Sequence, residues 1–175
     1  MLLVPLMGAS AAADQNDPRL GGLFERLQVV ANADEASFIE AEIWQIWLDV
    51  ADPEAGKLLQ TGLNAMHRGD YGAALAFFDD LVTTAPFYAE GWNKRATTHF
   101  MLGNYTESLK DIAQTLALEP RHFGALSGRG LVNLKLQKWE AALAAFEDAL
   151  AVSPRMASAH MHVEMLRRFL RKNEI

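Results

Sequence analysis

Three prolines stand 34 residues apart in this chain, and an aromatic residue keeps the same interval 15 positions before each of them. The prolines are Pro86, Pro120 and Pro154, and the aromatic residues are Tyr71, Tyr105 and Trp139. Self-similarity at a fixed interval of this length is the signature of a repeat architecture, in which one supersecondary unit is copied along the chain. The frame defines three units, 55–88, 89–122 and 123–156.

Within each unit, apolar residues recur at helical intervals on both sides of a short break. In the second unit, Trp92, Ala96 and Phe100 follow one another at steps of four, as on one face of a helix. Gly103 interrupts this pattern, a second helical stretch follows, and Pro120 ends it, because proline disfavours helix for the residue before it. Each unit is therefore predicted to be a helical hairpin. A single hairpin cannot bury both of its apolar faces, so neighbouring units must stack.

The unit resembles the tetratricopeptide repeat (TPR) in having an aromatic residue at its middle, a small residue, a bulky residue and a closing proline. The small residues are Ala74, Ser108 and Ala142, and the bulky ones are Phe78, Ile112 and Phe146. The resemblance covers 102 of the 175 residues, or three times 34. It departs from the family pattern at Gln137, which stands at the turn position of Gly69 and Gly103. The resemblance implies an all-α fold, an α-solenoid of three TPR hairpins.

Two further segments flank the repeats. Residues 17–52 carry helical signals of their own, and we interpret them as a leader helical hairpin, either a degenerate repeat or a capping hairpin. Residues 157–175 continue the frame as half a unit and are predicted to form a C-terminal capping helix. Four basic residues of this helix are expected to face outward: Arg167, Arg168, Arg171 and Lys172. They form a solvated face or, alternatively, a site for phosphate or an acidic partner.

Composition argues against several classes of function. A formal net charge of −6 and an isoelectric point near 5.3 argue against nucleic-acid binding, which needs a basic stripe. The chain has no cysteine, which excludes disulfides and thiolate metal sites. Outside the first residues, no stretch approaches the ~20 apolar residues that span a bilayer. The sequence shows neither a glycine-rich phosphate loop nor a nucleophile elbow. We therefore predict that the protein is not an enzyme and binds no cofactor or metal.

Residues 1–13 bear on the cellular compartment. Met1 to Met7 is apolar apart from its proline, the small residues from Gly8 to Ala13 resemble a secretory cleavage site, and polar residues follow. The positive charge that usually opens a signal peptide is missing. We expect export to a bacterial periplasm. An export signal followed by a leader hairpin and three repeats resembles the organisation of bacterial exported TPR proteins. The alternative is an apolar tail on a cytoplasmic protein.

The resemblance also implies where a partner would bind. In TPR arrays the first helix of each unit lines a concave groove, and the matching registers here are mostly apolar. They are Leu59, Leu63, Met66 and His67, then Asn93, Thr97, Phe100 and Met101, then Ser127, Leu131, Leu134 and Lys135. Such a groove suits an amphipathic helix or an apolar segment of another protein. We therefore predict a protein-protein interaction scaffold.

Some TPR domains instead hold a C-terminal carboxylate with Lys, Asn and Arg side chains at five registers. The matching residues here are Leu59, Leu63, Lys94, Gly124 and Gly128, so the resemblance does not extend to that clamp.

Three alternatives remain open for the groove. The leader hairpin carries Phe24, Phe38, Trp44 and Trp47, and it would hide this apolar surface by filling the groove itself. A homodimer would hide the groove as well. The third alternative is that the same apolar groove carries a small ligand or lipid.

Overall fold

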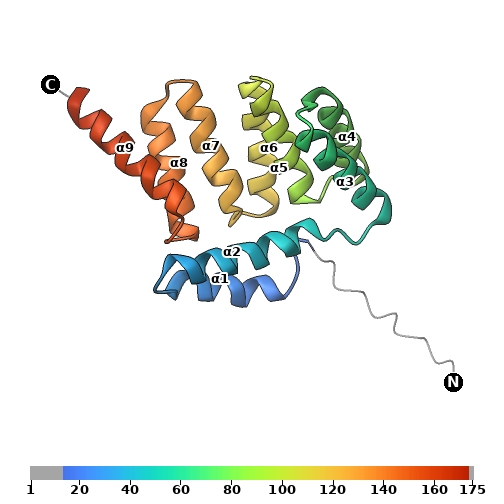
Figure 1. Cartoon of the computed structure of the whole chain (residues 1–175), viewed down its shortest axis with the longest axis horizontal. Coiled ribbons are helices and arrows are strands. Elements are labelled where there is room, and N and C mark those ends of the chain that lie inside the picture. Colours follow the sequence, from blue (N-terminus) through green and yellow to red (C-terminus); the bar gives the residue numbers. More distant parts are fainter. Residues whose placement is uncertain (1–13, 174–175) are drawn as a thin grey trace.

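The computed structural model describes residues 14–173, and this range is all-α, with nine helices, of which α3 to α9 form a solenoid (Figure 1). The leader hairpin consists of α1 (Arg19–Val29) and α2 (Ala33–Leu48). The three repeats are α3 (Pro53–His67) with α4 (Tyr71–Thr84), α5 (Ala89–Met101) with α6 (Tyr105–Leu118), and α7 (Phe123–Lys135) with α8 (Trp139–Val152). The last helix is α9 (Ala157–Asn173). The predicted fold class is confirmed.

The two helices of each repeat are joined by a tight turn with one left-handed residue. Gly69 and Gly103 adopt φ values of 75° and 78°, and Gln137 adopts 58° at the same register of the third repeat. Glycine reaches this region without steric cost, whereas a residue with a Cβ atom does not. The third turn nevertheless keeps the geometry of the other two, although Gln137 carries a Cβ atom.

The helices of a repeat approach closely because small residues face large ones. In the first repeat, the ring of Phe78 in α4 lies directly over Gly62 in α3. In the third repeat, the ring of Phe146 in α8 lies directly over Gly130 in α7. A methyl group at either glycine would stand within 2.6 Å of the facing ring. The small residues of the second helices, such as Ala142, are fully buried. Each hairpin is therefore held by close backbone packing.

The leader hairpin lies across the ends of the repeats, beside the loops that follow their second helices (Figure 1). One residue of each loop, two positions after the proline, contacts it. The Tyr88 hydroxyl donates a hydrogen bond of 2.6 Å to the Trp47 carbonyl oxygen. The His122 ring stacks on the Trp47 indole at 4.1 Å between centroids. Met156 packs against the hydrophobic cluster that the hairpin forms.

This placement differs from a hairpin stacked on the first repeat. Glu40 explains the difference, because it occupies the small-residue register at which Ala74 lets two helices meet. Instead of packing closely, the Glu40 carboxylate accepts a hydrogen bond from the Ser153 hydroxyl in the loop before α9. The leader hairpin thus crosses the array and does not extend it.

The helix α9 packs against α8 and is the last helix of the described range. Val163 and Leu166 of α9 are buried, and Leu170 is partly buried, as expected from the repeat frame. Arg167, Arg168 and Arg171 are exposed. A helix is thus present over residues 157–173 with the expected inward and outward residues, and its role as a cap stays a prediction.

The expectation of an export signal rests on residues 1–13, which lie outside the described part of the chain. Within residues 14–173, none of the helices has the length and apolar character needed to cross a membrane.

Candidate functional site

The first helices of the repeats, α3, α5 and α7, carry the residues that were predicted to line the groove. Four of them, Asn93, Thr97, Phe100 and Leu131, border a single hollow of about 70 Å³ between α5, α6 and α7. The floor of this hollow is formed by small and apolar residues, including Ser108 and Ile112. The structure therefore brings together residues of the second and third repeats that the sequence frame had assigned to one surface.

The predicted residues differ in how accessible they are. Thr97, Met101 and Lys135 are exposed, and Met101 shows 48% of its surface. Six others are partly buried: Leu63, Met66, Phe100, Ser127, Leu131 and Leu134. The structure places Leu59 elsewhere, because this side chain is 4% exposed and belongs to the core cluster with Phe78 and Tyr88. His67, at the end of α3, is exposed.

Asn93 was predicted to line the groove, but it is 6% exposed and its side chain is already hydrogen-bonded within the protein. Its side-chain amide donates a hydrogen bond of 2.9 Å to Glu90 Oε2. The same oxygen lies 2.8 Å from His122 Nε2, and Lys94 Nζ lies 2.7 Å from Glu90 Oε1. Three polar groups thus surround one buried carboxylate.

The protonation of this network follows from the cap of α7. The Ala125 backbone N–H donates to His122 Nδ1 at 3.1 Å, so Nε2 carries the ring proton and donates it to Glu90. Burial raises the pKa of the Glu90 carboxyl, but the charge of Lys94 and the hydrogen bond from His122 outweigh burial and bring it below its ordinary value. Glu90 is therefore an anion that ties α5 to the start of α7.

The leader hairpin covers this end of the concave face. The Trp44 indole lies so close to Gly124 that a methyl group there would stand 2.6 Å from it. Lys94 Nζ lies 5.0 Å from the centroid of the same indole. Two of the five carboxylate-clamp registers, Lys94 and Gly124, are thus in contact with Trp44. The opposite end of the face, around Met101 and Lys135, remains exposed.

The structure exposes three apolar residues of α9 at groove registers that the sequence interpretation left out. Met161, Met165 and Phe169 of α9 are 61%, 48% and 42% exposed. They lie one repeat interval after the predicted residues Ser127, Leu131 and Lys135. The 34-residue frame continues into residues 157–175, so extending the groove registers to this half unit would have found them.

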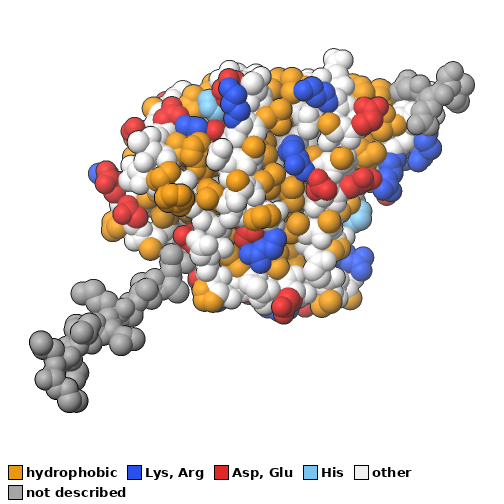
Figure 2. Space-filling model, turned by 180° about the vertical axis from the view of Figure 1, so that it is seen from behind, with side chains coloured by type: hydrophobic (Ala, Val, Ile, Leu, Met, Phe, Trp, Pro, Cys, Tyr) orange, Lys and Arg blue, Asp and Glu red, His pale blue; other side chains and the backbone are white. Residues whose placement is uncertain are grey.

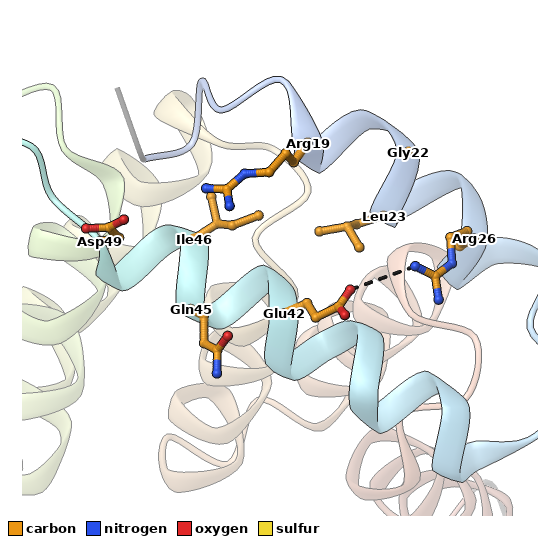
Figure 3. A pocket seen from close by; sticks show the side chains of 8 residues that line it. All are labelled: Arg19, Gly22, Leu23, Arg26, Glu42, Gln45, Ile46 and Asp49. Atoms are coloured by element: carbon orange, nitrogen blue, oxygen red, sulfur yellow. Dashed lines mark ion pairs between the residues drawn. The ribbon is translucent and has the colours of Figure 1, made fainter. Parts of the chain in front are cut away.

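A larger hollow, of about 760 Å³, lies between α1 and α2 (Figure 3). Four charged side chains line it: Arg19, Arg26, Glu42 and Asp49. Arg19 is already held by Asp17 at 2.7 Å, and Arg26 faces Glu42 at 3.8 Å. Its cations therefore have carboxylate neighbours, and the hollow offers no concentrated charge for a ligand.

The face seen in Figure 2 mixes acidic and basic side chains, with no continuous basic area in that view. Within residues 14–173, no group of three or more His, Asp or Glu side chains is placed to hold a metal ion.

The fold resembles known TPR domains. The first TPR domain of Spaghetti (RPAP3), solved with the HSP90 peptide SRMEEVD, superposes with a TM-score of 0.65 at 24% identity, over 67% of this chain and 93% of that domain. The crystal structure of MamA protein gives a TM-score of 0.62 at 18% identity, over 84% of this chain and 78% of MamA.

Sequence comparison agrees with the structural one. A tetratricopeptide-repeat family model matches residues 93–157. A TPR repeat-containing protein of Rhizobium etli is 37% identical over 165 residues, which is 94% of this chain and 79% of that protein. The Oryza sativa SGT1 homolog is 31% identical over 78 residues, 45% of this chain and 21% of its own length. With its repeat frame, its stacked hairpins and these relatives, the chain belongs to the tetratricopeptide-repeat family.

Proposed function

We propose that the protein is a non-catalytic scaffold that binds a segment of another protein on its concave face. The observation that carries this proposal is the set of apolar side chains that remain at least partly accessible at the groove registers of successive first helices. Met101 of α5 is exposed, and Leu131 and Leu134 of α7 are partly exposed. Large exposed apolar patches on soluble proteins commonly mark interaction surfaces.

Structural neighbours support binding of a polypeptide. The RPAP3 domain was solved with an HSP90 peptide, and a TPR domain of yeast Sti1 was solved in a complex with Hsp70. The clamp registers of this chain hold Leu59, Leu63, Lys94, Gly124 and Gly128, and Trp44 already contacts two of them. We therefore propose a partner that is recognised through apolar anchors and not through a terminal carboxylate.

A small-ligand or lipid carrier is the weaker hypothesis. The apolar hollow on the concave face measures about 70 Å³. Pockets for small molecules are usually of the order of 300–1,000 Å³. The larger hollow between α1 and α2 is rimmed by charged side chains, which do not suit a lipid chain.

A pair of adjacent substitutions tests the proposal. Met101 and Leu102 are 48% and 41% exposed, so aspartate at either position leaves the core intact. Only Met101 lies on the groove register. We expect Met101→Asp to lose a polypeptide that the wild-type chain captures from its native extract, while Leu102→Asp retains it. Circular dichroism checks that both variants are folded. Equal retention by Met101→Asp and the wild type would contradict the groove.

A further inference from the structure

The last helix exposes two faces that differ sharply in chemistry. In the complete repeats, the register that meets the second helix of the unit holds apolar or small residues: Leu58, Trp92 and Leu126 at one position, and Gly62, Ala96 and Gly130 at another. In α9 the same two positions hold His160 and Glu164, both exposed. This face of α9 is therefore polar, unlike the corresponding face of the three repeats.

The groove face of α9 has not become polar. Met161, Met165 and Phe169 follow one another at steps of four, so they form one row along the helix. With a rise of 1.5 Å per residue, the row is about 12 Å long, or roughly two turns. The Phe169 ring packs on the Trp139 ring of α8 at 5.0 Å between centroids, whereas Met161 and Met165 remain 61% and 48% exposed. Exposed apolar side chains gathered in this way are typical of interaction surfaces, where another molecule binds.

The charges beside the row indicate what kind of molecule this is. Arg168 and Lys172 line the same shallow surface as the three apolar residues, together with one acid, Glu164. Arg167, on the other side of the helix, is paired with Glu147 at 2.7 Å. Arg168 and Lys172 have no ion-pair partner within residues 14–173. Lys135, at the same end of the groove, has none in that range either. A local excess of cations is thus present in a chain of net charge −6.

We propose that this surface of α9 binds an amphipathic segment of a partner protein whose apolar side chains are flanked by Asp or Glu. The apolar residues would cover Met161 and Met165, and the carboxylates would pair with Arg168 and Lys172. A second copy of the chain fits less well, because two α9 surfaces face to face would bring their cations together. The proposal rests on the concave-face function and specifies the chemistry of the partner.

The test uses peptides selected on the full-length chain. A phage-displayed library of random 16-residue peptides is panned against the immobilised protein, and enriched peptides are synthesised with a fluorophore. Their dissociation constants are measured by anisotropy at 150 mM salt for the wild type, Met165→Glu and Arg168→Glu. Arg171→Glu is the matched control, because it makes the same charge change on an exposed position of the same helix. Sedimentation velocity of the free chain is run in parallel.

We expect the enriched peptides to carry acidic residues beside apolar ones. Met165→Glu and Arg168→Glu should each weaken binding about tenfold or more, equivalent to about 1.4 kcal/mol, while Arg171→Glu leaves it unchanged. Neutral or basic peptides, an equal effect of Arg168→Glu and Arg171→Glu, or a failure to enrich any peptide would overturn the proposal. A dimer that Met165→Glu dissociates would assign the surface to a second copy and overturn it too.

The same peptides separate this inference from the broader one. If Met101→Asp weakens binding and the α9 variants do not, the concave groove is supported and the role of α9 is refuted. If none of these variants changes the affinity, both the groove and the α9 surface are refuted as the binding site.

Discussion

Two glycines of α7, two positions apart, should respond in opposite ways to the same substitution. A Cβ atom at Gly130 would lie 2.6 Å from Phe146 Cζ and 2.7 Å from both adjacent Cε atoms. A Cβ atom at Gly128 would meet only Ile112 Cδ1, at an ordinary 3.8 Å. Both glycines lie inside the helix, so alanine improves helix propensity equally at both positions, by about 1 kcal/mol.

The magnitude follows from whether the facing ring can move. Phe146 is fully buried, and its ring stacks on His162 at 4.5 Å between centroids, so it has no free space behind it. Overpacking of this kind costs about 1–3 kcal/mol. We therefore expect Gly130→Ala to lower the free energy of unfolding by about 1 kcal/mol after the propensity gain, within a range of about 0–2 kcal/mol. Gly128→Ala should raise it by about 1 kcal/mol.

Urea denaturation followed by circular dichroism at 222 nm measures both variants beside the wild type. A difference of 1 kcal/mol corresponds to roughly 2–4 °C in the melting temperature of a chain of this size, so thermal melts give a second estimate. If Gly130→Ala is as stable as Gly128→Ala, the close approach of α7 and α8 is not what holds the third repeat together, and the packing argument fails.

Two predictions concern the contacts of the leader hairpin and the buried carboxylate. Tyr88→Phe should destabilise the protein by roughly 0.5–1.5 kcal/mol, because it removes a buried hydrogen bond to the Trp47 carbonyl. Denaturation followed by tryptophan fluorescence measures this change in stability. An unchanged stability would contradict the contact. Because the folded-state pKa of Glu90 is lowered, its contribution to stability is present above the ordinary value of 4.5 and is lost as the pH falls through the folded-state value. Glu90→Gln should be less stable than the wild type at pH 7 and should lose less stability between pH 6 and pH 3. Urea titrations at each pH measure the stability of both proteins. If the stability of the two proteins fell in parallel with pH, the stabilising role of the Glu90 carboxylate would be contradicted.

The repeats could be predicted from the sequence because their contacts are periodic. Ala74 and Phe78 recur in kind at every unit, so the frame alone places them in the core. The groove was less predictable, because accessibility also depends on the particular side chains around each position. Leu59 and Asn93 are both buried, the first against Phe78 and Tyr88 and the second beside Glu90, whereas Ser127 at the same register is only partly buried.

The buried carboxylate could not be predicted from any periodic pattern. Glu90 stands at the register of Gly56 and Gly124, and a charged residue there looks like an exposed one. It is 1% exposed because Lys94, Asn93 and His122 satisfy it from α5 and from the loop before α7. The docking of the leader hairpin is similar, since it depends on Trp47 meeting residues that lie 41 and more positions away.

The position of the leader hairpin sets an order of events during synthesis. Its contacts reach residues as distant as Arg155, whose Nε donates to the Val30 carbonyl across 125 positions. The repeats make mainly local contacts and can form as soon as each hairpin leaves the ribosome. The leader emerges first but cannot complete its contacts until the loop before α9 has been made. At a synthesis rate of about 5–20 residues per second, the cluster around Trp44 and Trp47 lacks its contacts with Val152 and Met156 for on the order of 5–20 s. During this time the nascent chain displays apolar surface that a chaperone would recognise, and a truncated chain would display it permanently.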